Sequence, residues 1–186
     1  MPGPTLTTAR LRLRRWRWSD LEPLAAINAD PEVMRYFPST LNRHETAMMI
    51  RRIEAHFIDN GFGLWALDIA DGASCIGFVG LSIPRFEAAF TPCVEIGWRL
   101  TKAVWGEGYA TEAARAALSF GFEARELDEV VAFTVPANHR SRRVMEKLGM
   151  KRDPRDDFEH PSLPQAHPLR RHVLYRLKTH SRPSSS

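Results

Sequence analysis

The sequence has little of several features that mark special classes of protein. Its two cysteines, Cys75 and Cys93, form no Cys-x-x-Cys pair, so we predict free buried thiols rather than a disulfide framework. Its seven histidines are scattered, without a His-Glu-x-x-His motif or a Cys/His cluster, which argues against a metal site. It also lacks an apolar run long enough to span a bilayer and the apolar core of a signal peptide. We therefore expect a cytoplasmic protein that binds no metal and no membrane.

What the chain does contain is ordinary for a globular protein. Its 186 residues are 44% hydrophobic and 26% charged, which is enough chain to bury one sizeable core. We predict a single domain over residues 1–179 and a disordered tail over residues 180–186. The net charge of +4 and the pI near 9.4 mildly favour anionic ligands.

The densest basic segment runs from residue 11 to residue 18 and interleaves arginine with leucine and tryptophan. Such a segment can suit RNA, because aromatic rings stack on bases and arginines meet phosphates. The alternative is a strand with one solvated face, in which Leu11 and Leu13 point inward and Arg12 and Arg14 point outward. We favour the strand and do not expect nucleic acid as a partner.

Hydrophobic periodicity, caps and turn residues predict the order of the elements. Strands are expected at 9–16, 64–69, 75–83, 94–100, 130–135 and 172–178. Helices are expected after a Ser19–Glu22 capping box, at 30–38, from Thr40 or Asn42 to Gly61, after Tyr109, and from Asn138 to Gly149, with a long loop at 153–169. This order predicts a mixed sheet covered by helices, which is an α+β fold.

A glycine-spaced turn lies between the strand at 94–100 and the helix that follows Tyr109. Gly106 and Gly108 remove side chains where a backbone can approach an anion, and the free N–H groups of a helix start suit phosphate. The spacing is neither that of a dinucleotide-binding Rossmann turn nor that of a P-loop. By itself, the turn favours an ordinary tight connection between a strand and a helix.

A second motif, N-x-x-S-x-x-V-M-E-K-L-G-M from Asn138, follows the buried strand at 130–135. Together with VEIGWRL and WGEGYATEA, it resembles the GNAT superfamily of acyl-CoA N-acyltransferases, most closely the branch of ribosomal-protein N-terminal acetyltransferases. TARLRLRRWRWSDLEPL and GLWALDIADGASCIGFVGL fit the same branch, so the resemblance covers residues 8 to about 178. It implies a mostly antiparallel central sheet flanked by helices, with a splayed parallel strand pair that holds the cofactor.

The resemblance implies acetyl-CoA as cosubstrate. Backbone N–H groups from Glu107 to Thr111 would hold the pyrophosphate, and strand residues 98–100 would pair with the pantetheine arm through their backbone. Asn138 would contact pantetheine, cap its helix, or do both, and Arg142 and Arg143 would reach the adenosine phosphates or form a solvated helix face. The implied cofactor-binding residues are Trp98, Arg99, Leu100, Trp105, Gly106, Glu107, Gly108, Tyr109, Ala110, Thr111, Asn138, Arg142 and Arg143. Trp105 departs from the Gln or Arg that is usual at its position.

Acetyl transfer to an amine needs a base, an oxyanion donor and an acid for the leaving thiolate. Glu95 is the candidate base, since it lies on the strand implied to carry the acyl end of the cofactor; a surface ion pair is the alternative. Met145 stands where many family members have a tyrosine acid, so Ser141, at the start of the Asn138 helix, is the candidate donor. A backbone N–H near Gly97 or Trp98 is the expected oxyanion donor, and Asn138 completes the catalytic set.

We expect direct attack by a primary amine in a ternary complex, because neither cysteine lies in a nucleophile-like setting. The acceptor would be a protein N-terminus or a small amine, in a pocket lined by Phe37, Trp65, His160 and His172. The two histidines are included because the segment HPSLPQAHPLRRHVLYRL resembles a recurrent ending in this branch. Two alternatives remain open: an inactive CoA-binding regulatory module, and a ribosome- or RNA-binding protein that uses the Arg12–Arg17 cluster. The sequence allows a monomer or a homodimer.

Overall fold

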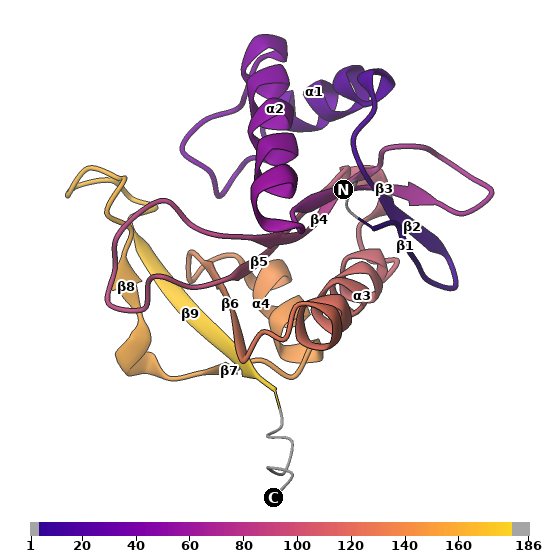
Figure 1. Cartoon of the computed structure of the whole chain (residues 1–186). Coiled ribbons are helices and arrows are strands. Elements are labelled where there is room, and N and C mark those ends of the chain that lie inside the picture. The colour runs from indigo at the N-terminus through magenta and orange to yellow at the C-terminus, as the bar shows by residue number, and fades with distance from the viewer. Residues whose placement is uncertain (1–3, 180–186) are drawn as a thin grey trace, which may run out of the picture.

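The computed structural model describes residues 4–179, which form one sheet covered by helices (Figure 1). In this part of the chain the nine strands are ordered β1-β2-β3-β4-β5-β6-β9-β7, and β8 pairs with β9. Every strand pair is antiparallel except β5 with β6, which is parallel. The α+β fold with a mostly antiparallel sheet is therefore confirmed. The predicted tail at 180–186 lies outside the described residues.

The strands are β1 (Leu6–Thr7), β2 (Leu11–Arg14), β3 (Leu64–Ile69), β4 (Gly77–Ser82), β5 (Glu95–Leu100), β6 (Glu129–Thr134), β7 (Lys151–Arg152), β8 (Phe158–Glu159) and β9 (Arg171–Lys178). The helices are α1 (Leu21–Ala29), α2 (Arg43–Asn60), α3 (Tyr109–Ala124) and α4 (His139–Lys147), with short 3-10 turns at Trp18–Asp20, Lys102–Val104 and Pro154–Asp156. No helix within residues 4–179 is long and apolar enough to cross a membrane.

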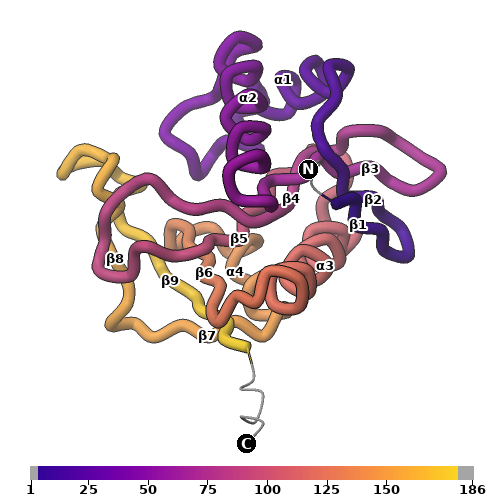
Figure 2. Tube along the Cα trace, in the orientation of Figure 1, coloured from indigo at the N-terminus to yellow at the C-terminus, as the bar shows by residue number. Residues whose placement is uncertain are grey.

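The helices cover opposite faces of the sheet. Leu81 of β4 is paired with Ile96 of β5, and this face is covered by α3, where Gly121 lets the helix approach Leu81 closely. Side chains alternate along a strand, so Arg99 points to the other face, where its guanidinium meets Asn28 of α1. Figure 2 follows the chain from α1 and α2 through β4 to the long connection that leads into β5.

Strand β5 leaves β6 almost at once. The only residue pair in their register is Glu95 with Val131, and the Val131 N–H donates to the Val94 carbonyl at 2.9 Å. On the other edge, the Thr101 N–H donates to the carbonyl of Ile76, which lies just before β4. Every second residue of β5 therefore turns its backbone N–H and C=O toward β4, and the residues between them turn theirs toward the parted edge, where β5 and β6 separate. Trp98 is on the parted edge, and its backbone groups pair with no strand there.

Several local predictions are corrected by the structure. Asp20 accepts a hydrogen bond from the Arg17 N–H at 2.7 Å, and α1 begins at Leu21 without a side-chain cap, so the Ser19–Glu22 capping box is not formed. Residues 31–36 form turns rather than a helix, and the expected loop at 153–169 contains a 3-10 turn and β8. Cys75 is buried as predicted, whereas Cys93 is half-buried.

The predicted solvated face of β2 is also wrong for Arg14. Leu11 and Leu13 are buried as expected, but Arg14 is only 4% exposed. Its guanidinium donates to both Asp20 carboxylate oxygens at 2.7 and 2.9 Å and to both Asp68 oxygens at 2.6 and 2.8 Å. The turn that precedes α1 folds over this face of the strand and carries Asp20 with it, so the arginine is enclosed.

Candidate active site

Glu95 stands at the point where β5 and β6 part. The residue is half-buried overall, and its carboxyl group makes no ion pair or hydrogen bond with a residue of the described chain, so the predicted alternative of a surface ion pair is not formed. Burial disfavours the charged form and raises the pKa of Glu95 to about 8. A lone carboxyl group of this kind is suited to exchange a proton near neutral pH.

Neither cysteine has a thiol that ionises readily. Burial, reinforced by the charge of Glu95, raises the pKa of Cys93 to about 11, and burial, reinforced by Asp20, raises the pKa of Cys75 to about 12. The thiolate is the nucleophilic form of cysteine, so neither side chain is poised for covalent catalysis at neutral pH.

The glycine turn presents an uncapped helix start. Gly106 and Gly108 have φ of +90° and +82°, left-handed values that favour glycine, and Gly108 is the N-cap of α3. Glycine has no side chain with which to cap the helix, so the first N–H groups of α3 keep no partner within it. A side chain at Gly106 would meet nothing within 4 Å, which leaves open space in front of the turn. These features fit an anion such as the pyrophosphate of CoA.

Neighbouring side chains hold the turn in place. Arg10 of the β1–β2 hairpin donates to the Glu107 carbonyl at 3.1 Å, pairs with Glu112 at 2.7 Å and lies over the Tyr109 ring at 4.6 Å. On the other side, the Trp105 indole N–H donates to the Leu100 carbonyl at 3.0 Å. Arg10 was not predicted from the sequence, because its contacts bridge about a hundred residues of chain.

The backbone of β5 supports only part of the predicted pantetheine contact. Trp98 presents its backbone to the parted edge, but the Leu100 carbonyl is already used by Trp105. Arg99 is paired with Phe78, and its backbone faces β4, so the prediction of a backbone contact from Arg99 is corrected. The Arg99 side chain lies instead on the face of the sheet covered by α1, where it meets Asn28.

Asn138 caps the N-terminus of α4, which is one of the two roles predicted for it. Its side-chain oxygen accepts from the Ser141 N–H at 3.3 Å, and its amide donates to the Thr134 hydroxyl at 3.0 Å, which ties α4 to the end of β6. The Ser141 hydroxyl makes no hydrogen bond within residues 4–179 and stays half-buried. Met145 is buried, with 2% of its surface exposed.

The predicted phosphate-binding arginines differ in their surroundings. Arg142 donates to the Tyr175 hydroxyl at 3.3 Å and to the Pro136 carbonyl at 3.1 Å, so its side chain is held against β9, while Arg143 is exposed. A hollow beside the glycine turn contains two other cations, Arg115 and Lys147, that sequence reasoning missed. It is lined by Thr8, Gly108, Thr111, Glu112, Arg115, Ala116, Ser119 and Lys147.

The four residues predicted to line the acceptor pocket lie in three different places. Trp65 is fully buried between Phe57 and Phe120, which corrects its assignment to the acceptor pocket. Phe37, in the α1–α2 connection, lies over the Arg99 guanidinium at 4.2 Å.

His160 and His172 come together, with ring centroids 5.2 Å apart. Burial lowers the pKa of both, and for His160 the neighbouring His172 adds to the effect. They belong to an aromatic cluster with Phe86, Phe90, Phe133 and Phe158, which was not predicted because its members come from four separate segments.

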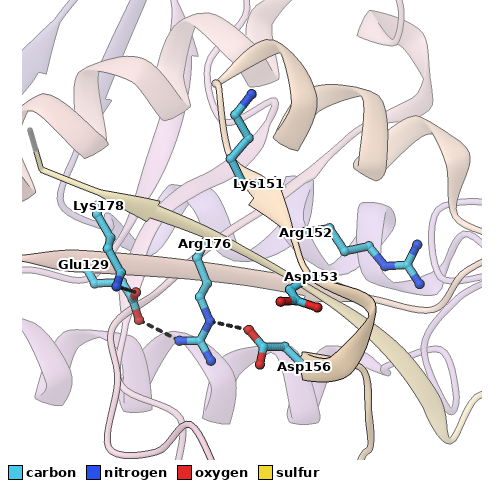
Figure 3. Close-up of a pocket in the computed structure, with 7 residues that line it drawn as sticks. All are labelled: Glu129, Lys151, Arg152, Asp153, Asp156, Arg176 and Lys178. Atoms are coloured by element: carbon cyan, nitrogen blue, oxygen red, sulfur yellow. Dashed lines mark hydrogen bonds and ion pairs between the residues drawn. The ribbon is translucent and has the colours of Figure 1, made fainter.

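A second hollow lies across β6, β7 and β9 (Figure 3). Arg176 bridges Glu129 and Asp156 at 2.7 Å each, and Lys178 also approaches Glu129 at 3.7 Å. Its central charges therefore neutralise one another, and we interpret it as an ion-pair network that joins these elements rather than as a ligand site. The lining residues are Glu129, Lys151, Arg152, Asp153, Asp156, Arg176 and Lys178. No group of His, Cys, Asp and Glu side chains between residues 4 and 179 is arranged to hold a metal ion.

Comparison with known proteins places the chain in a class of acetyltransferases. The acetyltransferase (GNAT) domain matches residues 10–151, so the chain belongs to the GNAT family, whose members take an acetyl group from acetyl-CoA. It is similar to the FsC-acetyl coenzyme A-N(2)-transacetylase of Aspergillus fumigatus, with 33% identity over 79% of this chain and 65% of that protein.

Solved structures share the fold. An acetyltransferase from Agrobacterium tumefaciens is 28% identical and superposes with a TM-score of 0.75 over 95% of both chains. A ribosomal-protein-serine acetyltransferase described as putative, from Vibrio cholerae, is 19% identical, with a TM-score of 0.76 over 96% of this chain and 99% of that one, and this likeness concerns the fold alone.

Proposed function

We propose that residues 1–179 form a single N-acetyltransferase domain that moves the acetyl group of acetyl-CoA to a primary amine by direct attack in a ternary complex. The observation that carries the proposal is Glu95, an unpaired carboxyl group with a pKa of about 8 where β5 and β6 part. Bound acetyl-CoA would supply an acetyl thioester. The protonated thiols of Cys75 and Cys93 support a route without a covalent enzyme intermediate.

The binding residues follow from the groups that are left without partners. The N–H groups from Glu107 to Thr111 would hold the pyrophosphate, with Arg10 holding the turn through the Glu107 carbonyl. The Trp98 backbone on the parted strand edge would take the pantetheine arm in the way that a sheet takes an added strand. Arg115 and Lys147, beside Gly108, would add positive charge for the remaining phosphate.

The catalytic roles rest on the same groups. Glu95 would accept the ammonium proton of the acceptor, directly or through water, because its pKa lies close to the working pH. Of the two predicted oxyanion donors, only the Trp98 N–H faces the parted edge; the Gly97 N–H faces β4. Ser141, whose hydroxyl has no partner in the described chain, would protonate the leaving thiolate, and Asn138 would position the helix that carries it.

The alternative of RNA binding is not supported by the arginine cluster. Arg14 is enclosed by Asp20 and Asp68, Arg15 is paired with Glu54, and Arg12 approaches Asp68 at 3.6 Å. Three of the four arginines in the Arg12–Arg17 cluster are therefore already paired, which leaves phosphates little free charge.

An assay of CoA thiol release, run over small amines and peptides with free N-termini, tests the proposal. We expect amine-dependent release that follows acetylation of the amine by mass. Tight CoA binding with no amine-dependent release would instead identify an inactive CoA-binding module.

A further inference from the structure

Arg99 is a buried cation without an acidic partner. Its side chain is 9% exposed, and no carboxylate of the described chain lies within ion-pair distance. Burial lowers the pKa of Arg99 to about 10, which still leaves it charged at neutral pH. Arg14, which is buried to a similar degree, has two aspartates. A buried charge of this kind is costly unless something pairs with it.

The free part of the guanidinium has a defined shape. One terminal nitrogen, Nη1, donates to Asn28 Oδ1 at 2.6 Å, with the Met49 sulfur at 4.0 Å. The Nε atom is buried without any partner, and Nη2 makes no hydrogen bond to the described residues either. Nε and Nη2 form the edge of arginine that presents two parallel N–H groups, which is the edge that binds a carboxylate through both oxygens.

The position of Arg99 connects this edge to the proposed base. Glu95, Gly97 and Arg99 share one face of β5, and a strand of this length separates the first Cα from the last by roughly 13 Å. Gly97 places no side chain between them: a Cβ there would meet only the Glu95 Oε1, at 3.9 Å. No side chain therefore blocks the route over Gly97, which is the path along β5 from the Glu95 carboxyl group to the Arg99 guanidinium.

Aromatic rings complete the far end of this route. The Phe37 ring lies 4.2 Å and the Phe78 ring 5.2 Å from the Arg99 guanidinium carbon. Phe37 is 38% exposed, so this end of the route reaches the surface at the α1–α2 connection. Rings over the guanidinium faces leave only its edges to hydrogen-bond a ligand.

We propose, on the basis of the function proposed above, that the acceptor is an extended amine that also carries a carboxylate. Its amine would lie at Glu95 and its carboxylate would bind the Nε–Nη2 edge of Arg99. The separation along β5 favours an amine and a carboxylate several bonds apart, as in an ω-amino acid or a short peptide, over an α-amino acid.

The test compares matched acceptors that differ only in charge. Acetylation of ω-amino acids of increasing length, and of short peptides with free C-termini, is measured against the corresponding carboxamides by kcat/KM. We expect the wild-type enzyme to prefer the carboxylates by about 10- to 100-fold, since a charged hydrogen-bonded pair is at stake. We expect Arg99→Gln to lower kcat/KM for the carboxylates far more than for the carboxamides, so that the preference is lost. Arg99→Lys, which keeps the charge but loses the paired N–H groups, should fall between them.

Arg51→Gln, at an exposed position of α2, is the matched control and should keep the wild-type preference. Equal use of carboxylates and carboxamides by the wild-type enzyme would overturn the Arg99 proposal and leave the acetyltransferase function standing. Loss of both series alike in Arg99→Gln, with CoA affinity retained, would also overturn it. Turnover of no amine at all, despite CoA binding, would overturn both proposals. The wild-type comparison decides the matter even if Arg99→Gln does not fold.

Discussion

Glu95 and Arg99 share one face of β5 and carry an acidic and a basic group, yet they form no ion pair. Gly97 lies between them without a side chain, and the Arg99 guanidinium is turned toward Asn28 of α1. The carboxyl group therefore keeps a pKa of about 8 that no neighbouring cation lowers.

Replacing the proposed base should change the rate and its pH dependence. A carboxyl group whose pKa is raised to about 8 is ionised only above that pH, so wild-type kcat/KM should rise with pH through about 8. Glu95→Gln should lower kcat by roughly 100- to 10,000-fold and abolish that limb of the profile, while CoA affinity is retained. Steady-state rates from pH 6 to 10 measure this, and an unchanged profile in Glu95→Gln would exclude Glu95 as the base.

Adding a side chain at the glycine turn should weaken CoA binding. Gly108 has a φ of +82°, which a β-branched residue rarely adopts, and a Cβ there would lie 3.5 Å from Arg10 Nη2, which holds the turn. Gly108→Val should therefore raise the Kd for CoA by roughly tenfold or more, as measured by calorimetry. Gly61→Val is the control, since Gly61 has a φ of +74° at the end of α2, away from the turn. An equal loss in both variants would mean that strain alone is responsible.

Removing the cap of α4 should affect both stability and CoA binding. Asn138→Ala loses the bonds to the Ser141 N–H and the Thr134 hydroxyl and should cost about 1 kcal/mol of unfolding free energy. Asn42→Ala removes the comparable cap of α2 and should cost a similar amount. Only Asn138→Ala should also raise the Kd for CoA. If both variants bind CoA like the wild-type protein, Asn138 is a cap and nothing more.

The thiol of Cys93 should be dispensable for acetyl transfer. The pKa of Cys93 is raised to about 11, so its thiolate is scarce at neutral pH. Cys93→Ser should keep kcat within about twofold, because direct transfer uses no thiolate nucleophile. Trapping of an acetylated Cys93 in the wild-type protein would contradict direct transfer.

The enclosed arginine of β2 should matter for stability. Arg14→Met leaves Asp20 and Asp68 buried without their cation and should cost about 3–5 kcal/mol in urea unfolding at pH 7. Arg12→Met, which removes a half-exposed arginine from the same strand, should cost less than about 1 kcal/mol. Similar losses in the two variants would contradict the enclosed network.

The same network sets a dependence on pH. Burial by itself would raise the pKa of Asp68, but hydrogen bonds from Arg14 and the Cys75 N–H outweigh it and hold the pKa below its usual 3.8. A carboxylate with a depressed folded-state pKa stabilises the protein above pH 3.8, and this contribution is lost as the pH falls through the folded-state value. The stability difference between wild type and Arg14→Met should shrink in that acidic range.

The sequence predicted the features that depend on local patterns. The alternation of β5 placed Glu95 opposite Val94, the glycines marked the start of α3, and Asn138 was recognised as a cap because capping needs only three residues. Features formed between distant segments were not predictable in this way. The period of a strand does not say which face is covered, so Arg14 was expected in solvent and Trp65 at a pocket. The lack of an acidic partner for Arg99 could be recognised only once its neighbours were known.

Because β5 and β6 part early, most of this edge of β5 has no strand partner, and the proposed cosubstrate would take that place. A ligand that binds only the folded protein adds to its unfolding free energy, by about 1.4 kcal/mol for each tenfold rise in free ligand above the Kd. The unfolding temperature of this protein would then rise with the concentration of CoA. The amide hydrogen of Trp98 would exchange slowly with solvent only when CoA occupies this edge of β5.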